Sequence, residues 1–545
     1  MPITIKKYLL PLILVLAILL RFININSIPS LNPDEAALGY NAYSLLKTGK
    51  DEHGASWPLH FKSFGDYKPG GYVYLTIPFV KVLGLTPLAV RLPNLILSVL
   101  TIYFLYKLVL LFTLDFRLSL LSAFVLSISP WHIHFSRGAW ESSVALSFTL
   151  IGIYYFYKFL KDFKLRHIYL FIILIVASLY TYHSARLVAP LLTFVLIILN
   201  FKTLFSRFKN LIIPLMLAIL ITLPVLISFL NNGGTTRLGG VGLTADYGPI
   251  SRAEELLNQH GNVKLVNRII HNKRLLYTLS WAEKYFSHYN LNYLFINGDE
   301  VPRSRSPEMG QLYLIELPLL ILGIFTLLKT RLLTKKNKIF IFSWIFIAPI
   351  ASSLTFQAPS ALRSLPLVIP LSIIVSLGTY HILKSIYSLK SQNIKKLFLL
   401  LITISYLYSL SYFIDSYFIH SPQRYPFAWN SKFEEIVPYI NSQKDYFQNI
   451  YLTDTYDQPY ILYLFYSKYP PQDIQKQIKL TPPDQFGFST VRQIDNIYFQ
   501  PIPQNFDTLK PNSLIIDDSK NIPGISPQKT INFPNGQPGF KIYTK

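Results

Sequence analysis

Two adjacent acids, Asp34 and Glu35, follow the first apolar segment of the chain, in the sequence Asn32-Pro33-Asp34-Glu35. Acids near a membrane segment are costly to keep close to lipid, so such residues usually have a function. A carboxylate within hydrogen-bond reach of a hydroxyl or an amine can act as a general base. The same four residues also suit the start of a helix, because Asn caps helices and acids favour the helix dipole. The two interpretations are compatible, and both stay open.

Basic residues follow on the same side of the predicted membrane. Lys68 lies in Tyr67-Lys68-Pro69-Gly70-Gly71, where Pro69 fixes the backbone and the glycines permit close approach of a ligand. An inert lysine at the membrane interface would fit the same pattern. Further charged residues recur at the outer ends of predicted helices: Arg91, Arg137, Glu141, Arg186, Arg303, Arg305 and Arg363. Arginine donates two parallel hydrogen bonds to phosphate, so these residues together suggest an anionic ligand.

The composition is that of a membrane protein. Hydrophobic residues make up 51% of the 545 residues and charged residues only 14%, whereas a soluble domain carries about a quarter of charged residues. The chain contains no cysteine, which excludes disulfides, thiolate nucleophiles and cysteine-ligated metals. Its net charge of +23 comes mostly from short loops between apolar runs, where basic residues set topology; nucleic-acid binding is not expected.

Eleven segments are predicted to span the membrane, because a hydrocarbon core of about 30 Å needs about 20 apolar residues per helix. They are 8–21, 88–112, 118–134, 141–160, 168–183, 186–200, 210–230, 311–328, 338–356, 365–383 and 396–415. Basic clusters before the first span and after the fourth, sixth, eighth and tenth spans fall on one side, which the positive-inside rule assigns to the cytoplasm. The first span could also be a signal peptide, but no small-residue cleavage site follows, so we favour a retained helix.

Three long segments are then extracytoplasmic, with the N-terminus in the cytoplasm. Loops 21–87 and 231–310 interrupt the membrane domain, and the second loop has amphipathic patterning. Residues 416–545 form a soluble segment, in which 449–453 and 513–517 are predicted strands and 460–469 a helix. We therefore predict a mainly α, polytopic membrane domain over 1–415 and a small extracytoplasmic α/β cap over 416–545.

The first outer loop resembles a known family. Asp34-Glu35, Lys68-Pro69-Gly70 and Arg91-Leu92-Pro93 together resemble the polytopic GT-C glycosyltransferases, in particular the protein O-mannosyltransferases and the lipid A aminoarabinose transferases. The resemblance covers about residues 1–415. It implies a GT-C fold in the cell membrane and inverting transfer of a sugar from a polyprenyl phosphate. The acceptor would be an extracytoplasmic lipid, glycan or protein.

The resemblance also implies roles for individual residues. By motif position Asp34 would be the general base and Glu35 its neighbour, while Lys68 would bind the phosphate. Arg91, Arg137 and Arg363 would contact phosphate or support the structure. Members of the family often carry an aspartate where this chain has Glu141. Like most such relatives, the chain need not use a metal, because fixed cations can offset the phosphate charge; no cofactor is expected, and a divalent metal is possible but not indicated.

Other functions remain possible on the sequence alone. The same fold could serve an oligosaccharide-transferring enzyme or polymerase, and a lipid-linked glycan transporter or flippase would also be polytopic. Transporters tend to place polar residues at mid-membrane on broken helices, whereas the acids and arginines of this chain gather at outer helix ends. A non-catalytic scaffold that displays the C-terminal cap is a third alternative, for which Asp34 would be dispensable.

Overall fold

The computed structural model describes residues 3–231, 242–259, 269–484, 487–518 and 525–545. The chain divides into two compact units. Unit 1 contains Met1–Leu20, Leu97–Phe135 and Ser142–Phe413, and unit 2 contains Arg21–Ile96, Ser136–Glu141 and Ile414–Lys545. The C-terminal segment therefore shares a unit with the first outer loop, so this division differs from the predicted boundary at residue 415. Parts of the predicted loop 231–310 lie outside the described residues.

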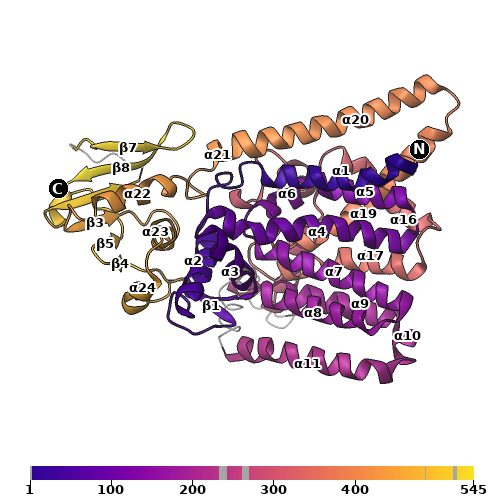
Figure 1. Ribbon diagram of the computed structural model, residues 1–545, viewed down its shortest axis with the longest axis horizontal. Coiled ribbons are helices and arrows are strands. Elements are labelled where there is room, and N and C mark those ends of the chain that lie inside the picture. Colours follow the sequence, from indigo (N-terminus) through magenta and orange to yellow (C-terminus); the bar gives the residue numbers. More distant parts are fainter. Residues whose placement is uncertain (1–2, 232–241, 260–268, 485–486, 519–524) are drawn as a thin grey trace. The chain divides into compact units, whose positions relative to one another are not determined.

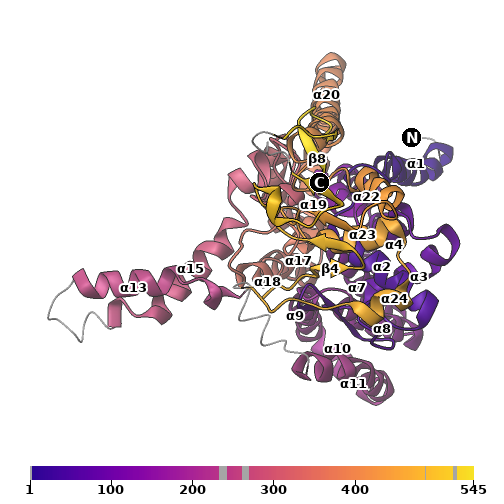
Figure 2. The ribbon, with the colours of Figure 1, turned by 90° about the vertical axis from the view of Figure 1, so that its left-hand side faces the viewer.

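Unit 1 is built from apolar helices, many of which run side by side (Figure 1). The helices that lie in this unit, or enter it from unit 2, are α1 (Ile3–Phe22), α4 (Pro87–Thr113), α5 (Phe116–Ile128), α6 (Pro130–Arg137), α7 (Glu141–Asp162), α8 (Leu165–Thr181), α9 (Ala185–Leu199), α10 (Phe201–Phe205), α11 (Phe208–Asn231), α13 (Gly248–Gln259), α15 (Lys273–Ser287), α16 (Glu316–Lys329), α17 (Lys335–Ile347), α18 (Ile350–Ser353), α19 (Val368–Ser388) and α20 (Gln392–Asp415). Figure 2 shows α13 and α15 extending away from the other helices of this unit.

The multi-pass character of the chain is confirmed by these helices. Five helices in the described part of the chain are long and apolar enough to cross a membrane: Pro87–Thr113, Glu141–Asp162, Phe208–Ser228, Leu365–Ser388 and Gln392–Arg424. Helices α5 and α6 together satisfy the same criterion, with a bend of 56° between them. Each predicted span overlaps one or two of the helices of the chain: 118–134 covers α5 and α6, and 338–356 covers α17 and α18. The total of eleven spans stays a prediction. Helix α3 (Gly71–Leu83), an apolar helix within the predicted loop 21–87, was not predicted.

Small residues allow α16 and α19 to pack backbone against backbone. A Cβ atom added at Gly323 would lie 1.9 Å from the carbonyl oxygen of Ile374, and one added at Gly378 would lie 2.0 Å from that of Leu319. Neither position has room for any side chain. Close approach through small residues is a common way for membrane helices to associate, because lipid supplies no hydrophobic driving force between them.

Unit 2 contains a six-stranded mixed sheet in the order β4-β5-β3-β6-β8-β7. Its strands are β3 (Asn449–Leu452), β4 (Gln493–Ile494), β5 (Ile497–Phe499), β6 (Ser513–Asp517), β7 (Lys529–Asn532) and β8 (Pro538–Thr544). The fully buried β3 pairs in parallel with β5 and β6, and the other pairs are antiparallel. The predicted strands at 449–453 and 513–517 are therefore confirmed. Helix α23 (Pro459–Ser467) confirms the predicted helix, and α22 (Phe433–Gln443) and α24 (Pro471–Gln477) complete the segment.

The first outer loop supplies a helix and a hairpin to the same unit. Helix α2 (Pro33–Thr48) begins after Asn32, and strands β1 (His60–Ser63) and β2 (Asp66–Pro69) form an antiparallel hairpin. Phe64 and Gly65 connect the strands with φ values of 55° and 86°, as the favoured two-residue hairpin turn requires. Helix α2 packs against α23 so closely that a Cβ atom at Gly39 would lie 2.7 Å from the Phe465 ring. The C-terminal segment thus supports the helix that carries Asp34.

We expect Gly378→Leu to destabilise the helix bundle. The added side chain would overlap the backbone of α16, and overpacking of this kind typically costs about 1–3 kcal/mol or more. The melting temperature of the purified protein in detergent should fall clearly. Ser385→Ala, at an exposed position of the same helix, should leave it within error of the wild type. Equal melting temperatures for Gly378→Leu and the wild type would contradict the packing described here.

Candidate active site

The structure joins Asp34 of helix α2 to Lys68 of strand β2. The Nζ atom of Lys68 donates a hydrogen bond to Oδ1 of Asp34, and the two side chains form an ion pair. The Asp34 side chain is 42% exposed and the Lys68 side chain 18% exposed. Lys68 also lies over the Phe64 ring, with Nζ at 4.9 Å from the ring centroid. Two residues that are 34 positions apart in the sequence therefore form one accessible acid–base pair.

Lys68 is surrounded by carboxylates. Burial by itself would lower the pKa of Lys68, but the charges of Asp34, Glu141 and Asp66 raise this pKa above its usual value. Lys68 therefore stays protonated at neutral pH. Glu141, the first residue of α7, thus belongs to the electrostatic surroundings of Lys68.

Glu35 is buried, although it lies next to Asp34. Its Oε1 atom accepts hydrogen bonds from Nε of Arg91 at 2.8 Å and from the backbone N–H of Ala139 at 2.7 Å. Its Oε2 atom accepts from Nη2 of Arg91 at 2.6 Å and from the backbone and side-chain N–H groups of Asn32 at 3.3 and 3.2 Å. Asn32 Oδ1 accepts in return from the Glu35 N–H at 3.1 Å, which confirms the predicted helix cap. These contacts suit a positioning residue better than a base that faces a substrate.

Arg91 is fully buried and holds the chain before helix α2 in place. Besides its two bonds to Glu35, Nη1 donates to the carbonyl oxygens of Ile25 at 2.6 Å and Pro29 at 2.9 Å, and Nη2 donates to that of Ser30 at 3.3 Å. A guanidinium has five N–H groups, so these five bonds use all of them. The hydrogen bonds of Arg91 therefore support a structural role and leave no donor for the predicted phosphate contact.

Arg137 is also buried and has a similar role. Its Nη2 atom donates to the carbonyl oxygens of Ile23 at 2.5 Å and Ile28 at 2.8 Å. The guanidinium carbon lies 4.5 Å from the centroid of the Phe418 ring and 5.3 Å from that of Tyr417. These contacts tie the chain before α2 to the start of the C-terminal segment within unit 2. The aromatic residues Tyr417 and Phe418 were not predicted as part of the site, because only their contact with Arg137 in the folded chain singles them out.

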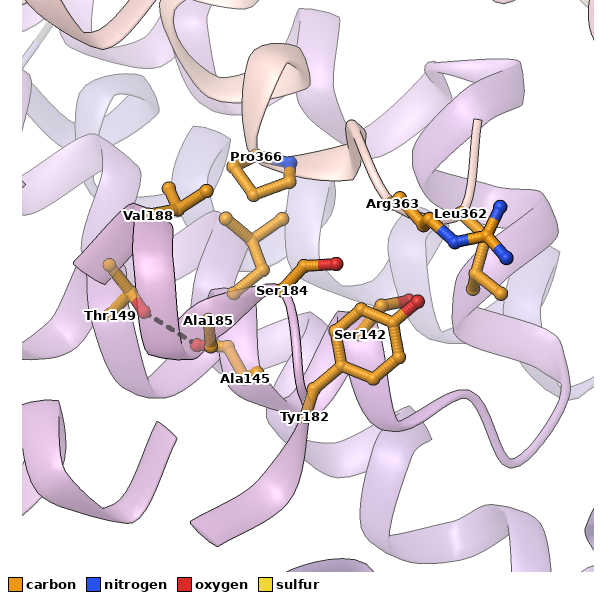
Figure 3. Close-up of a pocket in the computed structure, with 11 residues that line it drawn as sticks. Ser142, Ala145, Thr149, Tyr182, Ser184, Ala185, Val188, Leu362, Arg363 and Pro366 are labelled. Atoms are coloured by element: carbon orange, nitrogen blue, oxygen red, sulfur yellow. Dashed lines mark hydrogen bonds between the residues drawn. The ribbon is translucent and has the colours of Figure 1, made fainter. Parts of the chain in front are cut away.

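Arg363, the remaining predicted cation, lies in unit 1 and lines a small pocket with a cavity volume of about 20 Å³. Figure 3 shows Arg363 together with Ser142, Tyr182 and Ser184 among the residues that line this pocket. The only hydrogen bond from the Arg363 side chain that we identify in the described residues is a long one of 3.4 Å, from Nη1 to the carbonyl oxygen of Gln357. The lining of this pocket therefore contains one cation and several hydroxyl groups.

Glu52 is a buried acid of unit 2 that was not predicted. It follows Asp51 in a second acidic pair of the first outer loop, and that pair is the sequence signal that could have revealed it. Burial raises the pKa of Glu52 to about 8. Across the described part of the chain, no group of three or more histidines and acids is placed to hold a metal ion.

Removal of the Arg91 side chain should unfold the site. Arg91→Met leaves Glu35 as a buried charge without its partner, which typically costs about 3–5 kcal/mol. We expect a much lower melting temperature and loss of folded protein. Two control variants should have melting temperatures close to that of the wild type: Asp34→Asn in helix α2 and Lys62→Met in strand β1. Normal stability of Arg91→Met would show that the Glu35–Arg91 pair does not hold this unit together.

Comparison with known proteins gives one family match. Residues 68–228 match the family described as Dolichyl-phosphate-mannose-protein mannosyltransferase. The matched segment begins at Lys68 and includes Arg91, Arg137 and Glu141. No curated protein shows significant sequence similarity to the chain.

Solved structures share the fold. ArnT from Cupriavidus metallidurans bound to undecaprenyl phosphate matches with a TM-score of 0.55 and a sequence identity of 10%. ArnT in the apo state matches with a TM-score of 0.55 and a sequence identity of 11%. Both matches cover 97% of this chain and 97% of the other chain. An oligosaccharyltransferase from Archaeoglobus fulgidus in complex with Zn and sulfate matches with a TM-score of 0.50 and a sequence identity of 13%. This match covers 84% of this chain and 61% of the other chain. The likeness to ArnT thus extends through the C-terminal segment. The chain has the GT-C fold, and residues 68–228 match the family of mannosyltransferases named above.

Proposed function

We propose that this protein transfers a hexosyl or pentosyl group from a polyprenyl phosphate to an acceptor outside the cytoplasm. The observation that carries the proposal is the exposed Asp34 paired with Lys68 at the start of helix α2. The match to a dolichyl-phosphate-mannose-dependent family and the shared fold with ArnT, which has been solved with undecaprenyl phosphate, support a lipid-phosphate donor. A lipid, a glycan or a protein would each be a chemically suitable acceptor.

Asp34 is the proposed general base. It would take the proton of an acceptor hydroxyl or amine while the acceptor atom attacks the anomeric carbon of the sugar. The bond between that carbon and the phosphate oxygen breaks on the opposite face, and the configuration inverts. The 42% exposure of the Asp34 side chain supports this role, because a base must reach the proton that it removes.

Lys68 is the proposed phosphate ligand. An ammonium group has three donor hydrogens, so Lys68 can bond to Asp34 and still donate to a phosphate oxygen. Its raised pKa keeps it charged, and a fixed cation offsets the charge that develops on a leaving phosphate. Donor binding would also draw Lys68 partly away from Asp34 and leave that carboxylate more available to the acceptor.

The other predicted residues receive more limited roles. Glu35, Arg91 and Arg137 would position the loop that carries Asp34, as their buried hydrogen bonds suggest. Glu141 would help to keep Lys68 charged. Arg363 would bind an anionic or hydroxyl-rich part of a substrate in the pocket of unit 1.

A second pocket of unit 1 offers apolar surface to a lipid chain. It has an empty volume of about 700 Å³ and is lined by residues of α5, α19 and α20: Leu121, Phe124, Val125, Ile128, Thr379, Leu383, Ile402, Thr403, Tyr406, Leu407 and Leu410. Isoprenoid units are apolar, so this surface would suit the polyprenyl part of the donor.

Oligosaccharide transfer is the second candidate function. It is favoured by the shared fold with the oligosaccharyltransferase of Archaeoglobus fulgidus. The two candidates differ in the donor, which would carry one sugar or a preassembled glycan. Parallel assays with both kinds of polyprenyl-linked donor would separate them.

Asp34→Asn should abolish sugar transfer without unfolding the protein. The amide keeps the size of the side chain but cannot take a proton, and loss of a general base typically lowers the rate about 10²–10⁴-fold. The assay uses purified protein in detergent with polyprenyl-phosphate sugars, and product is followed by mass spectrometry. Normal turnover by Asp34→Asn would remove Asp34 as the base, and Asp473→Asn, at an exposed acid of the same unit, serves as the matched control.

Lys68→Ala should weaken use of the donor. A hydrogen bond to a charged group contributes about 1.5–3 kcal/mol, so we expect the KM for the donor to rise about tenfold or more. Steady-state kinetics with varied donor, at a fixed acceptor concentration, measure this change. Lys62→Ala, on the paired strand, should keep the wild-type KM. An unchanged KM in Lys68→Ala would place the phosphate elsewhere.

A further inference from the structure

Helix α15 of unit 1 carries an apolar stripe that the described residues leave uncovered. The stripe consists of Leu275, Leu279, Ala282 and Phe286, which follow one another at steps of four, three and four residues and therefore share one face of the helix. Leu275 is 39% exposed, Leu279 55% and Phe286 66%. Exposed apolar side chains that gather on one face commonly mark an interaction surface.

The side of α15 away from the stripe is attached to the rest of unit 1. Nζ of Lys284 donates a hydrogen bond to Oδ2 of Asp246 at 2.9 Å, and the hydroxyl group of Tyr277 donates to the Asp246 carbonyl oxygen at 3.1 Å. Each residue advances a helix by about 100°, so Tyr277 and Lys284 point away from the stripe. The helix therefore cannot roll its stripe toward the unit without breaking these contacts.

The last turn of α15 and the residues after it are fixed to the end of α17. The hydroxyl group of Tyr285 donates to the Phe346 carbonyl oxygen at 2.8 Å, and that of Tyr289 donates to the Ile345 carbonyl oxygen at 2.9 Å. Both carbonyl groups lie in the last turn of α17, where a helix leaves its carbonyl groups without internal partners. Helix α17 begins with lysines at 335–336, so the positive-inside rule predicts that its other end is extracytoplasmic.

Helices α13 and α15 run across the direction of the apolar helices of unit 1. Figure 1 shows α7 and α9 along the horizontal, and Figure 2, turned by 90°, shows α13 and α15 spreading sideways. Helix α7 is long and apolar enough to span a membrane. An amphipathic helix that lies across the spanning helices has the direction of one that lies in the plane of the membrane interface.

The charges of α15 suit an anionic surface. Lys273 and Arg274 are both exposed and lie in the first turn of the helix, which contains no acid. The helix dipole disfavours cations at this end, so the helix itself is not stabilised by them. An anionic surface next to the helix would attract both side chains. Within α15, Glu283 is the single acid.

We propose that α15 is an interfacial helix, which inserts its apolar stripe into the bilayer surface and binds anionic phospholipid headgroups through Lys273 and Arg274. The stripe would leave water for the region below the headgroups, which is favourable for apolar side chains. A lipid surface offers apolar chains and anionic headgroups side by side, and this combination matches a stripe with a basic pair at one end. The proposal needs only the multi-pass character of the chain, so it is tested independently of the proposed function.

Site-specific fluorescence tests the position of the stripe. The chain contains no cysteine, so a single cysteine variant takes up one fluorescent label. Leu279→Cys and Phe286→Cys place the label on the stripe, and Ser280→Cys, at a half-buried position turned away from it, is the matched control. The labelled proteins are reconstituted into phosphatidylcholine vesicles that contain doxyl-labelled lipid. We expect strong quenching at positions 279 and 286 and weak quenching at position 280.

A second comparison tests the basic pair. The label at position 279 is quenched with doxyl-labelled phosphatidylglycerol or with doxyl-labelled phosphatidylcholine, at equal mole fractions. Attraction to an anionic surface corresponds to about a fivefold enrichment per basic residue, so the anionic lipid should quench at about fivefold lower mole fraction or less. Lys273→Gln together with Arg274→Gln should abolish this preference. Glu283→Gln, which removes a charge of opposite sign, should not lower it.

The outcomes decide between a lipid and a protein on this face. Quenching at positions 279 and 286 that is no stronger than at position 280 would overturn the proposal. A label on the stripe that neither doxyl lipid nor aqueous iodide reaches would show that protein covers the stripe, such as a second copy of the chain, and would overturn it as well. Equal quenching by the two lipids in the otherwise unchanged protein would overturn the headgroup contact. Two labelled positions on the stripe keep the test decisive if one variant does not fold.

Discussion

The buried ion pair between Glu35 and Arg91 is the interaction on which the proposed site depends. Removing two charges from water is costly. The attraction between the charges offsets that cost only when their remaining hydrogen-bonding groups are also satisfied. Here Arg91 uses all five of its N–H groups, and both oxygens of Glu35 accept bonds. The pair thereby connects the start of helix α2 to the start of α4. Its other hydrogen bonds connect both to the chain before α2 and to the backbone of Ala139. A lysine at position 91 could not make these contacts, because it lacks the planar fork.

This constraint explains how two adjacent acids come to differ so strongly. Successive residues of a helix point about 100° apart, so one of two neighbours at a helix start can face inward while the other faces outward. Glu35 is buried against Arg91, and Asp34 is left at the surface beside Lys68. The buried acid fixes the helix start, and the partly exposed acid forms an ion pair with Lys68.

The C-terminal segment is part of the same physical unit, although it follows the last apolar helix. The hydroxyl group of Tyr40 in α2 donates to the Tyr469 carbonyl oxygen at 2.9 Å, and the Gln475 amide donates to Ser44 and Thr48 at 3.1 and 3.0 Å. Arg137 adds its contacts with the rings at 417–418. Loops that carry functional residues are often positioned by a rigid scaffold, and the C-terminal segment provides such support to the helix that carries Asp34.

Local patterns in the sequence were enough for the membrane character, the helical segments, the helix start at Asn32 and the central strands of the C-terminal segment. Each of these depends on neighbouring residues, through hydropathy, capping or strand periodicity. The same patterns singled out Asp34, Lys68 and Arg91 as chemically unusual, but they could not assign the partner of each charge. Tertiary structure alone decided that Lys68 meets Asp34, that Arg91 is saturated by Glu35 and backbone carbonyls, and that Glu52 is buried. The free energy of a charge depends on what surrounds it in space, and residues distant in the chain supply those surroundings.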